Sequence, residues 1–356
     1  MSNLNTSLVT SMQPTNGLLL INLGSPSAPT EAAVRSYLKE FLSDPRVMDI
    51  PFLVRQMVLR LFILPKRPAK VAPKYRQIWG EQASPLIEST GSLGTKVQAL
   101  LGENWKVLVA MRYGEPDLEA ALESMRAAKL TTLVVLPLFP QYASATTGSV
   151  IEKVFKVTQS WKTIPSICTI NQFYQHQSLV QGFANRGRGL ITNSTDHILF
   201  SFHGLPVRHL EESDCTQTCL KDEHCCSQPK AAARGCYKAQ CLGTAKSIAN
   251  ELGLEPAGWS TAFQSRLGKD EWIGPNLLDE LARLADSGKK NLVVFCPSFV
   301  ADCLETLEEI AISAQETFTR AGGETLKLVP SLNDDDDWAK GITQIIQCSR
   351  YLDLLG

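Results

Sequence analysis

Short β-rich runs alternate with helix-patterned segments along most of the 356 residues of this chain. The β-rich runs lie at residues 17–23, 107–111, 132–138, 197–202, 259–263, 291–295 and 326–329. Helical patterns fall between them, as at residues 30–42, 118–129, 242–252, 277–287 and 303–320. Strands that alternate with helices are typical of parallel sheets with helices packed on their faces. The pattern therefore predicts an α/β fold.

Two segments of the chain resemble each other and suggest an internal repeat. Residues 133–139 and 292–299 are both buried-strand patterns that run into Pro and then into a helix. A length of about twice an ordinary domain agrees with two similar halves. We expect two similar doubly wound domains, at 17–172 and 173–356, with parallel sheets flanked by helices and the active site in the cleft between them. The last helix could pack back on the first domain.

The composition argues against two classes of protein. The chain has 35 Lys and Arg against 36 Asp and Glu, a formal net charge of -1, so it lacks the basic excess of a nucleic-acid binder. The longest apolar stretch, between Pro51 and Pro65, includes Arg55, Gln56 and Arg60 and is too short and too polar to span a bilayer. It could form a core helix, the lip of a substrate site or a segment that touches a membrane surface. In the last case we expect Arg55 and Arg60 to face outward, toward anionic lipid headgroups.

The first sixteen residues are rich in Ser, Thr and Asn and contain no Lys or Arg. We interpret residues 1–16 as a disordered tail, because a signal or transit peptide would carry basic residues. Ten cysteines without an export signal indicate reduced thiols. The expected location is the cytoplasm, possibly at the inner face of the membrane.

Three predicted strands end in polar residues, and ligands in such folds bind beyond the carboxyl ends of the strands. These residues are Arg112 and Tyr113, His203 and Gly204, and the run from Asp302 to Glu309. Asp302 is a candidate helix N-cap, and Glu305 and Glu309 are spaced for one helix face. Spacing alone leaves two interpretations open. The acids could simply be stabilised by the helix dipole, or they could pass a hard cation or protons inward as a line of oxygen ligands. A lone His such as His203 is likewise often structural.

Several of these segments, in the same order, resemble motifs of the ferrochelatases. The similarity extends from about Gly17 to Trp338. Its most specific parts are LLLINLGSP at 18–26, MRYG at 111–114, PQY at 140–142, TTGS at 146–149, SFHGLP at 201–206, QSR at 264–266, WIGP at 272–275 and DCLETLEE at 302–309.

The resemblance implies an enzyme that inserts Fe2+ into protoporphyrin IX, giving protohaem and two protons. It places His203 and Glu305 on opposite sides of the porphyrin as catalytic and Fe2+-binding residues. The i, i+4 spacing, not the resemblance, adds Glu309 as a relay. It also implies that Arg112, Tyr113 and Trp272 line the same cleft and contact the porphyrin. Residues 52–65 would form one lip of the pocket. Just after the lip, Arg67 would lie near a porphyrin propionate, with Lys66 or Lys70 as alternatives in that role.

The required chemistry suits these residue types. The porphyrin must lose two pyrrole protons and pucker before the metal reaches its nitrogens. Neutral His203 can accept a proton near neutral pH, and Glu305 can bind a hard cation or relay its protons. Bending the macrocycle uses apolar binding energy, of the order of 1–5 kcal/mol. The sequence leaves open which residue handles protons and which handles iron.

A cysteine-rich insert, residues 213–241, follows the SFHGLP motif. Thiolates around a metal would hold a polar loop of this length in place. Paired CxxC knuckles typical of zinc sites are missing, and four thiolates equally suit a 2Fe-2S cluster, which some bacterial ferrochelatases similar to this chain carry in an internal segment. We expect such a cluster on four of the six cysteines, with Cys241 the weaker candidate. They are Cys215, Cys219, Cys225, Cys226, Cys236 and Cys241.

Two other functions remain as alternatives at this point. The same architecture could serve a non-catalytic haem or iron sensor, or a chelatase for another metal or tetrapyrrole. The expected partners are protoporphyrin IX and Fe2+, without nucleic acid and with weak peripheral membrane association. The sequence leaves the oligomeric state open.

Overall fold

The computed structural model describes residues 14–214, 219, 225–227, 235–266 and 270–347. It contains two parallel four-stranded sheets, one with the order β2-β1-β3-β4 and the other with the order β6-β5-β7-β8. This arrangement confirms the predicted α/β fold with two similar halves. The strands are β1 Asn16–Asn22, β2 Trp105–Met111, β3 Thr132–Pro137, β4 Ser166–Thr169, β5 His197–His203, β6 Trp259–Gln264, β7 Asn291–Phe295 and β8 Thr325–Leu328.

The central strands are buried on both faces, which is why they contain almost continuous apolar sequence. Residues Leu18 to Ile21 of β1 and Leu133 to Leu136 of β3 are fully buried. The two segments that resemble each other in sequence form β3 and β7, which occupy the same place in their sheets. The internal repeat is therefore real in three dimensions.

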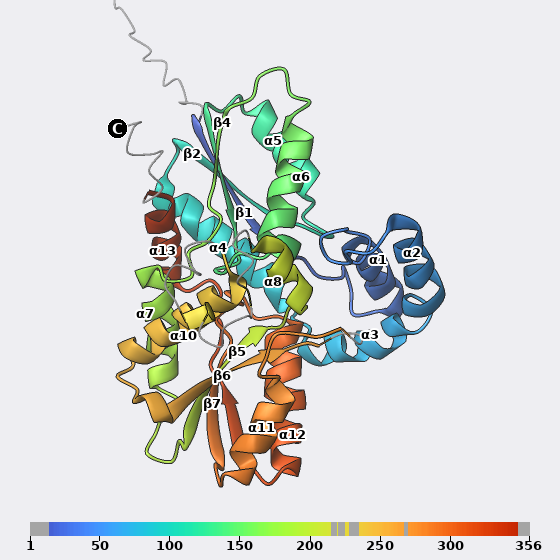
Figure 1. The fold of residues 1–356 in the computed structure, drawn as a ribbon. Helices are drawn as coiled ribbons and strands as arrows, with labels where there is room; N and C mark the ends of the chain where they lie inside the picture. The colour runs from blue at the N-terminus through green and yellow to red at the C-terminus, as the bar shows by residue number, and fades with distance from the viewer. Residues whose placement is uncertain (1–13, 215–218, 220–224, 228–234, 267–269, 348–356) are drawn as a thin grey trace, which may run out of the picture.

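Helices cover both sheets, and a lobe made of α1, α2, η1 and α3 projects to one side (Figure 1). In the first half the helices are α1 Glu31–Phe41, α2 Phe52–Val58, η1 Leu59–Ile63, α3 Arg67–Ile78, α4 Pro85–Leu101, α5 Leu118–Ala127, η2 Ser144–Gly148 and α6 Ser149–Thr158. In the second half they are α7 Gln177–Arg188, α8 Val207–Ser213, η3 Cys225–Ser227, α10 Tyr237–Glu251, η4 Pro256–Gly258, α11 Leu277–Asp286, η5 Leu304–Ala314, α12 Gln315–Arg320 and α13 Asp336–Gln347.

The last helix returns to the first half of the molecule. Helix α13 packs on α4 and α7, and its Ile342, Ile345 and Ile346 join the core that also contains Leu93 and Val97 of α4. Lys96 of α4 adds ion pairs with two acids at the start of α13, Asp334 at 3.3 Å and Asp336 at 2.8 Å. This packing ties the two halves together on the side opposite the lobe (Figure 1).

Several local features differ from the sequence-based expectations. The sequence did not predict β4, a four-residue edge strand with little apolar pattern. Three segments form π-helices, η1, η2 and η5, which apolar periodicity does not distinguish from α-helices. Of the expected N-terminal tail, residues 1–13 lie outside the described part of the chain. Asn16 already belongs to β1, and Thr15 donates to the Asn104 carbonyl.

Candidate active site at the strand ends

His203 is the last residue of β5 and the only residue of that strand that is not fully buried. Its Nδ1 lies 2.6 Å from the carbonyl oxygen of Gly204. A carbonyl only accepts, so Nδ1 carries the proton and Nε2 is left with a lone pair in the neutral ring. The backbone carbonyl of His203 accepts a 2.8 Å hydrogen bond from the hydroxyl of Tyr237 on α10. One hydrogen bond from the ring and one to the backbone carbonyl therefore fix the position of His203, with Nε2 as the proton acceptor of the ring.

Gly204 leaves room for Trp272 beside the histidine. A β-carbon at position 204 would lie 2.8 Å from the Gln264 carbonyl and 3.1 Å from the Trp272 ring. Pro206 forms an isolated antiparallel bridge with Trp272. The structure therefore brings Trp272 next to the SFHGLP turn.

Glu305 and Glu309 both lie on η5, which follows β7. Gln264 at the end of β6 donates to the Glu305 carbonyl at 2.7 Å and to Glu309 Oε2 at 3.2 Å. The backbone N–H of Ser265 donates to Glu309 Oε1 at 2.9 Å, and the Ser265 hydroxyl donates to Oε2. Ser265 has φ of +67°, a strained conformation for a residue with a side chain. In this conformation the backbone N–H of Ser265 points toward Glu309 Oε1.

The electrostatics connect His203, Glu305 and Glu309. Burial raises the pKa of Glu309, and the nearby charge of Glu305 raises it further. Hydrogen bonds from Ser265 and Gln264 and the charge of His203 oppose that rise. Glu309 is thus a buried acid that holds its proton more strongly than an exposed one and lies close to both other groups.

The acidic run does not begin as expected, because Cys303 rather than Asp302 is the N-cap of η5. The Asp302 carboxylate accepts from the Thr306 hydroxyl at 3.0 Å and from Asn333 Nδ2 at 2.8 Å. Asp302 therefore anchors the loop before α13. Glu308, between the two site acids, is buried and binds Lys74 of α3 with both carboxylate oxygens at 2.8 Å.

Arg112 and Tyr113 follow β2, but they form a network of their own. The Arg112 guanidinium lies over the Tyr113 ring at 4.5 Å and donates to Asp44 Oδ2 at 2.6 Å. The Tyr113 hydroxyl donates to the same oxygen at 2.8 Å, and Ser149 donates to it at 2.6 Å. Tyr113 is 1% exposed. The sequence analysis missed Asp44 because nothing in its local pattern distinguishes it from a surface acid.

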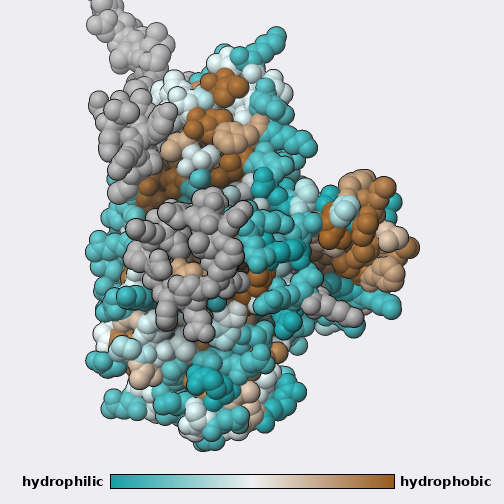
Figure 2. Space-filling model, in the orientation of Figure 1, coloured by the Kyte–Doolittle hydropathy of each residue, from teal (hydrophilic) through white to brown (hydrophobic). Residues whose placement is uncertain are grey.

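The lip at 52–65 forms α2 and η1 and exposes large apolar side chains (Figure 2, brown lobe at the right). The exposed residues are Phe52, Leu53, Val54, Met57, Leu61 and Phe62. Arg67 is an exposed residue at the start of α3, next to exposed Lys66 and Lys70. Arg55 was expected to face outward, and this was wrong. It is 6% exposed and donates to the carbonyls of Met48 and Ile50, both at 3.0 Å.

The cysteine-rich insert lies between α8 and α10, and its described thiols gather against α10. Cys225 Sγ and Cys226 Sγ are 3.4 Å apart. A hydrogen bond from Cys226 lowers the pKa of Cys236, the N-cap of α10. Burial raises the pKa of Cys219, and Cys236 and Cys225 are near enough to raise it further. These thiols are chemically suited to bind iron or zinc. Among the described residues, however, no group of three or more His, Cys, Asp or Glu has the geometry of a metal site.

Cys241 differs from the other cysteines of the insert because it lies within α10. It is fully buried in the main core, and burial raises its pKa. This placement supports its rank as the weaker candidate ligand. Cys215 lies outside the described residues.

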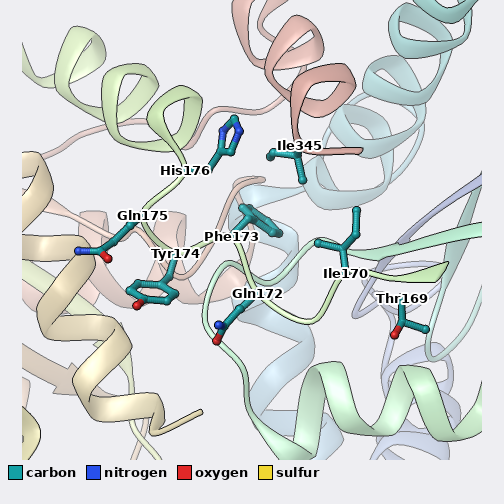
Figure 3. A pocket seen from close by; sticks show the side chains of 8 residues that line it. All are labelled: Thr169, Ile170, Gln172, Phe173, Tyr174, Gln175, His176 and Ile345. Carbon is teal, nitrogen blue, oxygen red and sulfur yellow. The ribbon is translucent and has the colours of Figure 1, made fainter. Parts of the chain in front are cut away.

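A cavity of about 420 Å³ lies at the linker between the two halves (Figure 3). Residues 169, 170 and 172–176 and Ile345 of α13 line it, including Phe173, Tyr174 and His176. None of the candidate catalytic residues lines this cavity. It belongs to the linker and the returning helix, not to the strand ends that carry His203 and Glu305.

Comparison with known proteins identifies the family. The ferrochelatase family model matches residues 15–349. The chain belongs to the ferrochelatase family. A ferrochelatase of Coxiella burnetii is 43% identical over 337 residues, 94% of each chain. One of Legionella pneumophila strain Lens is 44% identical over 330 residues, 93% of this chain and 98% of the relative. As a ferrochelatase, the chain is a lyase of haem synthesis, and its substrates are Fe2+ and a porphyrin.

Solved structures agree on the fold. The sirohydrochlorin chelatase SirB of Bacillus subtilis subspecies spizizenii, in complex with cobalt, has a TM-score of 0.52 at 10% identity. SirB from Bacillus subtilis with Fe3+ has a TM-score of 0.50 at 11% identity. In both cases the match covers 94% of each chain. At this low identity the similarity concerns the two-domain fold alone.

The family assignment decides between the functions considered from the sequence. It favours a ferrochelatase over a non-catalytic sensor or a chelatase for another metal. Within the described part of the chain, no helix is long and apolar enough to cross a membrane.

Proposed function

We propose that this ferrochelatase deprotonates protoporphyrin IX with His203 and delivers Fe2+ past Glu305 and Glu309. The observation that carries the assignment is the contact between His203 Nδ1 and the Gly204 carbonyl, which leaves Nε2 free to accept a pyrrole proton. The carboxylates of Glu305 and Glu309 suit a hard cation and can take the second proton. Clamping of the ring by Trp272 and the lip supplies the distortion.

An anaerobic assay with protoporphyrin IX and either Fe2+ or Zn2+, followed by absorbance, tests this function. The free-porphyrin bands should decay to those of the metalloporphyrin at a rate proportional to enzyme. A sensor would bind the ring without turnover. A chelatase for another tetrapyrrole would leave protoporphyrin unchanged.

We propose further that the insert binds a 2Fe-2S cluster with four of its cysteines, drawn from Cys219, Cys225, Cys226, Cys236 and Cys215. The support is the convergence of the described thiols and the lowered pKa of Cys236, because thiolate is the ligand form. Cys236 stands at the start of a 15-residue helix, where its backbone partners favour the anion. When bound, the cluster would cross-link a long polar loop.

Metal and sulfide analysis of anaerobically purified protein tests the cluster. We expect red-brown protein with two irons per chain, and Cys219→Ser or Cys236→Ser should lose the colour. Cys168→Ser, on β4, is the matched control and should keep it. One zinc per chain would replace the cluster by a structural zinc site, and protein without metal would reject both.

We also propose that the exposed lip mediates weak peripheral association with anionic membranes. Leu53 is 79% exposed and Phe62 is 65% exposed, and the start of α3 adds exposed Lys66, Arg67 and Lys70. Flotation with anionic vesicles should recover the protein at low salt. Leu53→Glu with Phe62→Glu should abolish recovery, whereas Phe155→Glu, at a half-exposed site on α6, should not.

A further inference from the structure

Arg208, near the start of α8, binds carboxylates from two distant parts of the chain. Its Nε donates to Asp49 Oδ2 at 2.8 Å, and Nη2 donates to Asp49 Oδ1, so the contact is bidentate. Its Nη1 donates to Asp270 Oδ2. Asp49 lies in the loop that leads into the lip, and Asp270 lies two residues before Trp272. One side chain thus joins the lobe, the turn after His203 and the segment that carries Trp272.

Asp49 is held in position from the lobe side. Buried Arg55 of α2 donates to the carbonyls of Met48 and Ile50, the two residues that flank Asp49. The backbone at Asp49 is therefore fixed before its carboxylate meets Arg208, which reduces the entropy lost in forming the pair. From the other side, His209 of α8, next to Arg208, places its Nε2 3.1 Å from Asp49 Oδ2, and its side chain is 9% exposed.

Arg208 is held in position from the side of the catalytic histidine. The N–H of Val207 donates to the Glu271 carbonyl at 2.9 Å, and the N–H of Ile273 donates to the Leu205 carbonyl at 3.0 Å. These bonds tie the start of α8 to residues 271–273. Arg208 is only five residues after His203, so little backbone freedom separates them.

A second ion pair joins the lobe to the other catalytic segment. Lys74 of α3 binds both oxygens of Glu308, which is buried on η5 three residues after Glu305. The Ser313 hydroxyl donates to the same carboxylate at 2.8 Å. The lobe is therefore fastened once beside His203 and once beside Glu305. Both fastenings use charged groups with at least one mostly buried partner.

We propose that these two contacts, Asp49–Arg208–Asp270 and Lys74–Glu308, form a clasp that holds the lip over the porphyrin site. The inference rests on the proposed porphyrin site. Asp49, Arg208, Lys74 and Glu308 are positioning residues that touch neither iron nor the reacting nitrogens. In variants that lack the clasp, the lobe should occupy its closed position only part of the time. The apparent affinity for porphyrin is then reduced in proportion to the fraction of molecules that are closed. The clasp therefore controls porphyrin affinity and leaves the chemical step unchanged.

Porphyrin binding and steady-state kinetics of clasp variants test the proposal. Asp49→Asn and Arg208→Gln should each raise the Kd and the KM for protoporphyrin about five- to tenfold, with kcat within twofold of wild type. The double variant should be little worse than Arg208→Gln alone, because Arg208→Gln already removes the contact with Asp49 that both substitutions share. Arg208→Lys, which keeps the charge but not the bidentate geometry, should lie between. Arg188→Gln is the matched control, since it breaks an ion pair with Glu251 between α7 and α10.

Unchanged Kd and KM in both single variants would overturn the clasp, and so would a loss confined to kcat. Multiplicative effects in the double variant would also contradict it. Should Arg208→Gln fail to fold, Lys74→Gln, which removes the second contact of the lobe, replaces it. The binding measurement needs no turnover. If the wild type does not insert Fe2+, the proposed function fails while the Kd series still decides the clasp.

Discussion

The hydroxyl of Tyr237 donates a 2.8 Å hydrogen bond to the backbone carbonyl of His203. Tyr237 follows Cys236 directly and is buried at the start of α10. The first turn of α10 thus connects the cysteine-rich insert to His203, the proposed base. A change in the insert that shifts this turn should therefore also shift the backbone of His203.

Tyr237→Phe should lower kcat about threefold to tenfold without changing the iron content of the purified protein. The variant removes one buried hydrogen bond, worth about 1 kcal/mol, and frees the end of β5. Parallel activity and iron measurements check it. Loss of iron together with activity would mean that the hydroxyl supports the insert rather than His203.

His203→Ala should abolish metal insertion while the protein stays folded. The ring is only partly buried, and its described aromatic neighbour is Phe299 at a centroid distance of 6.3 Å, so its removal leaves little core cavity. Circular dichroism and porphyrin binding should remain near wild type. Glu305→Gln should behave in the same way. A folded variant with substantial turnover contradicts the assignment.

Glu309→Gln should lower kcat about a hundredfold and remove the contribution of Glu309 to the acidic limb of the pH profile. Burial raises the pKa of Glu309, and only the ionised form accepts a proton. The wild-type rate should therefore increase as pH rises through this raised value. Gln cannot ionise, so the variant should lack that dependence. Glu316→Gln, at an exposed site on α12, is the control and should keep the wild-type profile.

Glu308→Gln should reduce the free energy of unfolding by about 2 kcal/mol, because it weakens a charge-assisted contact of a buried side chain with Lys74. Glu308 is not on the face shared by Glu305 and Glu309 and binds Lys74 instead. We expect kcat to be kept. Denaturant unfolding measures the loss, and unchanged stability would show that Lys74 is satisfied by water.

Asp44→Asn should destabilise the protein by about 3 kcal/mol at pH 7, because it leaves the mostly buried Arg112 without its counter-charge. Burial opposes ionisation of Asp44, but bonds from Ser149, Arg46 and Tyr113 and the charge of Arg112 lower its pKa overall. A lowered pKa stabilises the fold above the unfolded value, about 3.9, and this contribution is lost as pH falls through the folded value. The difference between variant and wild type should therefore shrink below about pH 4.

The sequence predicted the strands that are buried on both faces, since long apolar runs leave few alternatives. It also singled out three candidates for the site, His203 at the end of β5 and Glu305 and Glu309 on the helix that follows β7, and their roles stay predictions. It did not predict what depends on distant pairing. Asp44 and Asp49 acquire their roles only when Arg112 and Arg208 are folded against them. The outward placement of Arg55 was wrong because charge alone does not reveal that two backbone carbonyls surround it.

The matching strand orders give the two halves one architecture with different side chains at equivalent places. In each half the third strand in sheet order is followed by a π-helix, η2 in the first half and η5 in the second. The last residue of β1 is Asn22, where β5 has His203, and the second residue of η2 is Ala145, where η5 has Glu305. The candidate reactive groups thus belong to the second half, while the lobe between β1 and β2 belongs to the first half. The two halves therefore divide the proposed work: one supplies the chemistry, and the other supplies a surface for a large flat substrate.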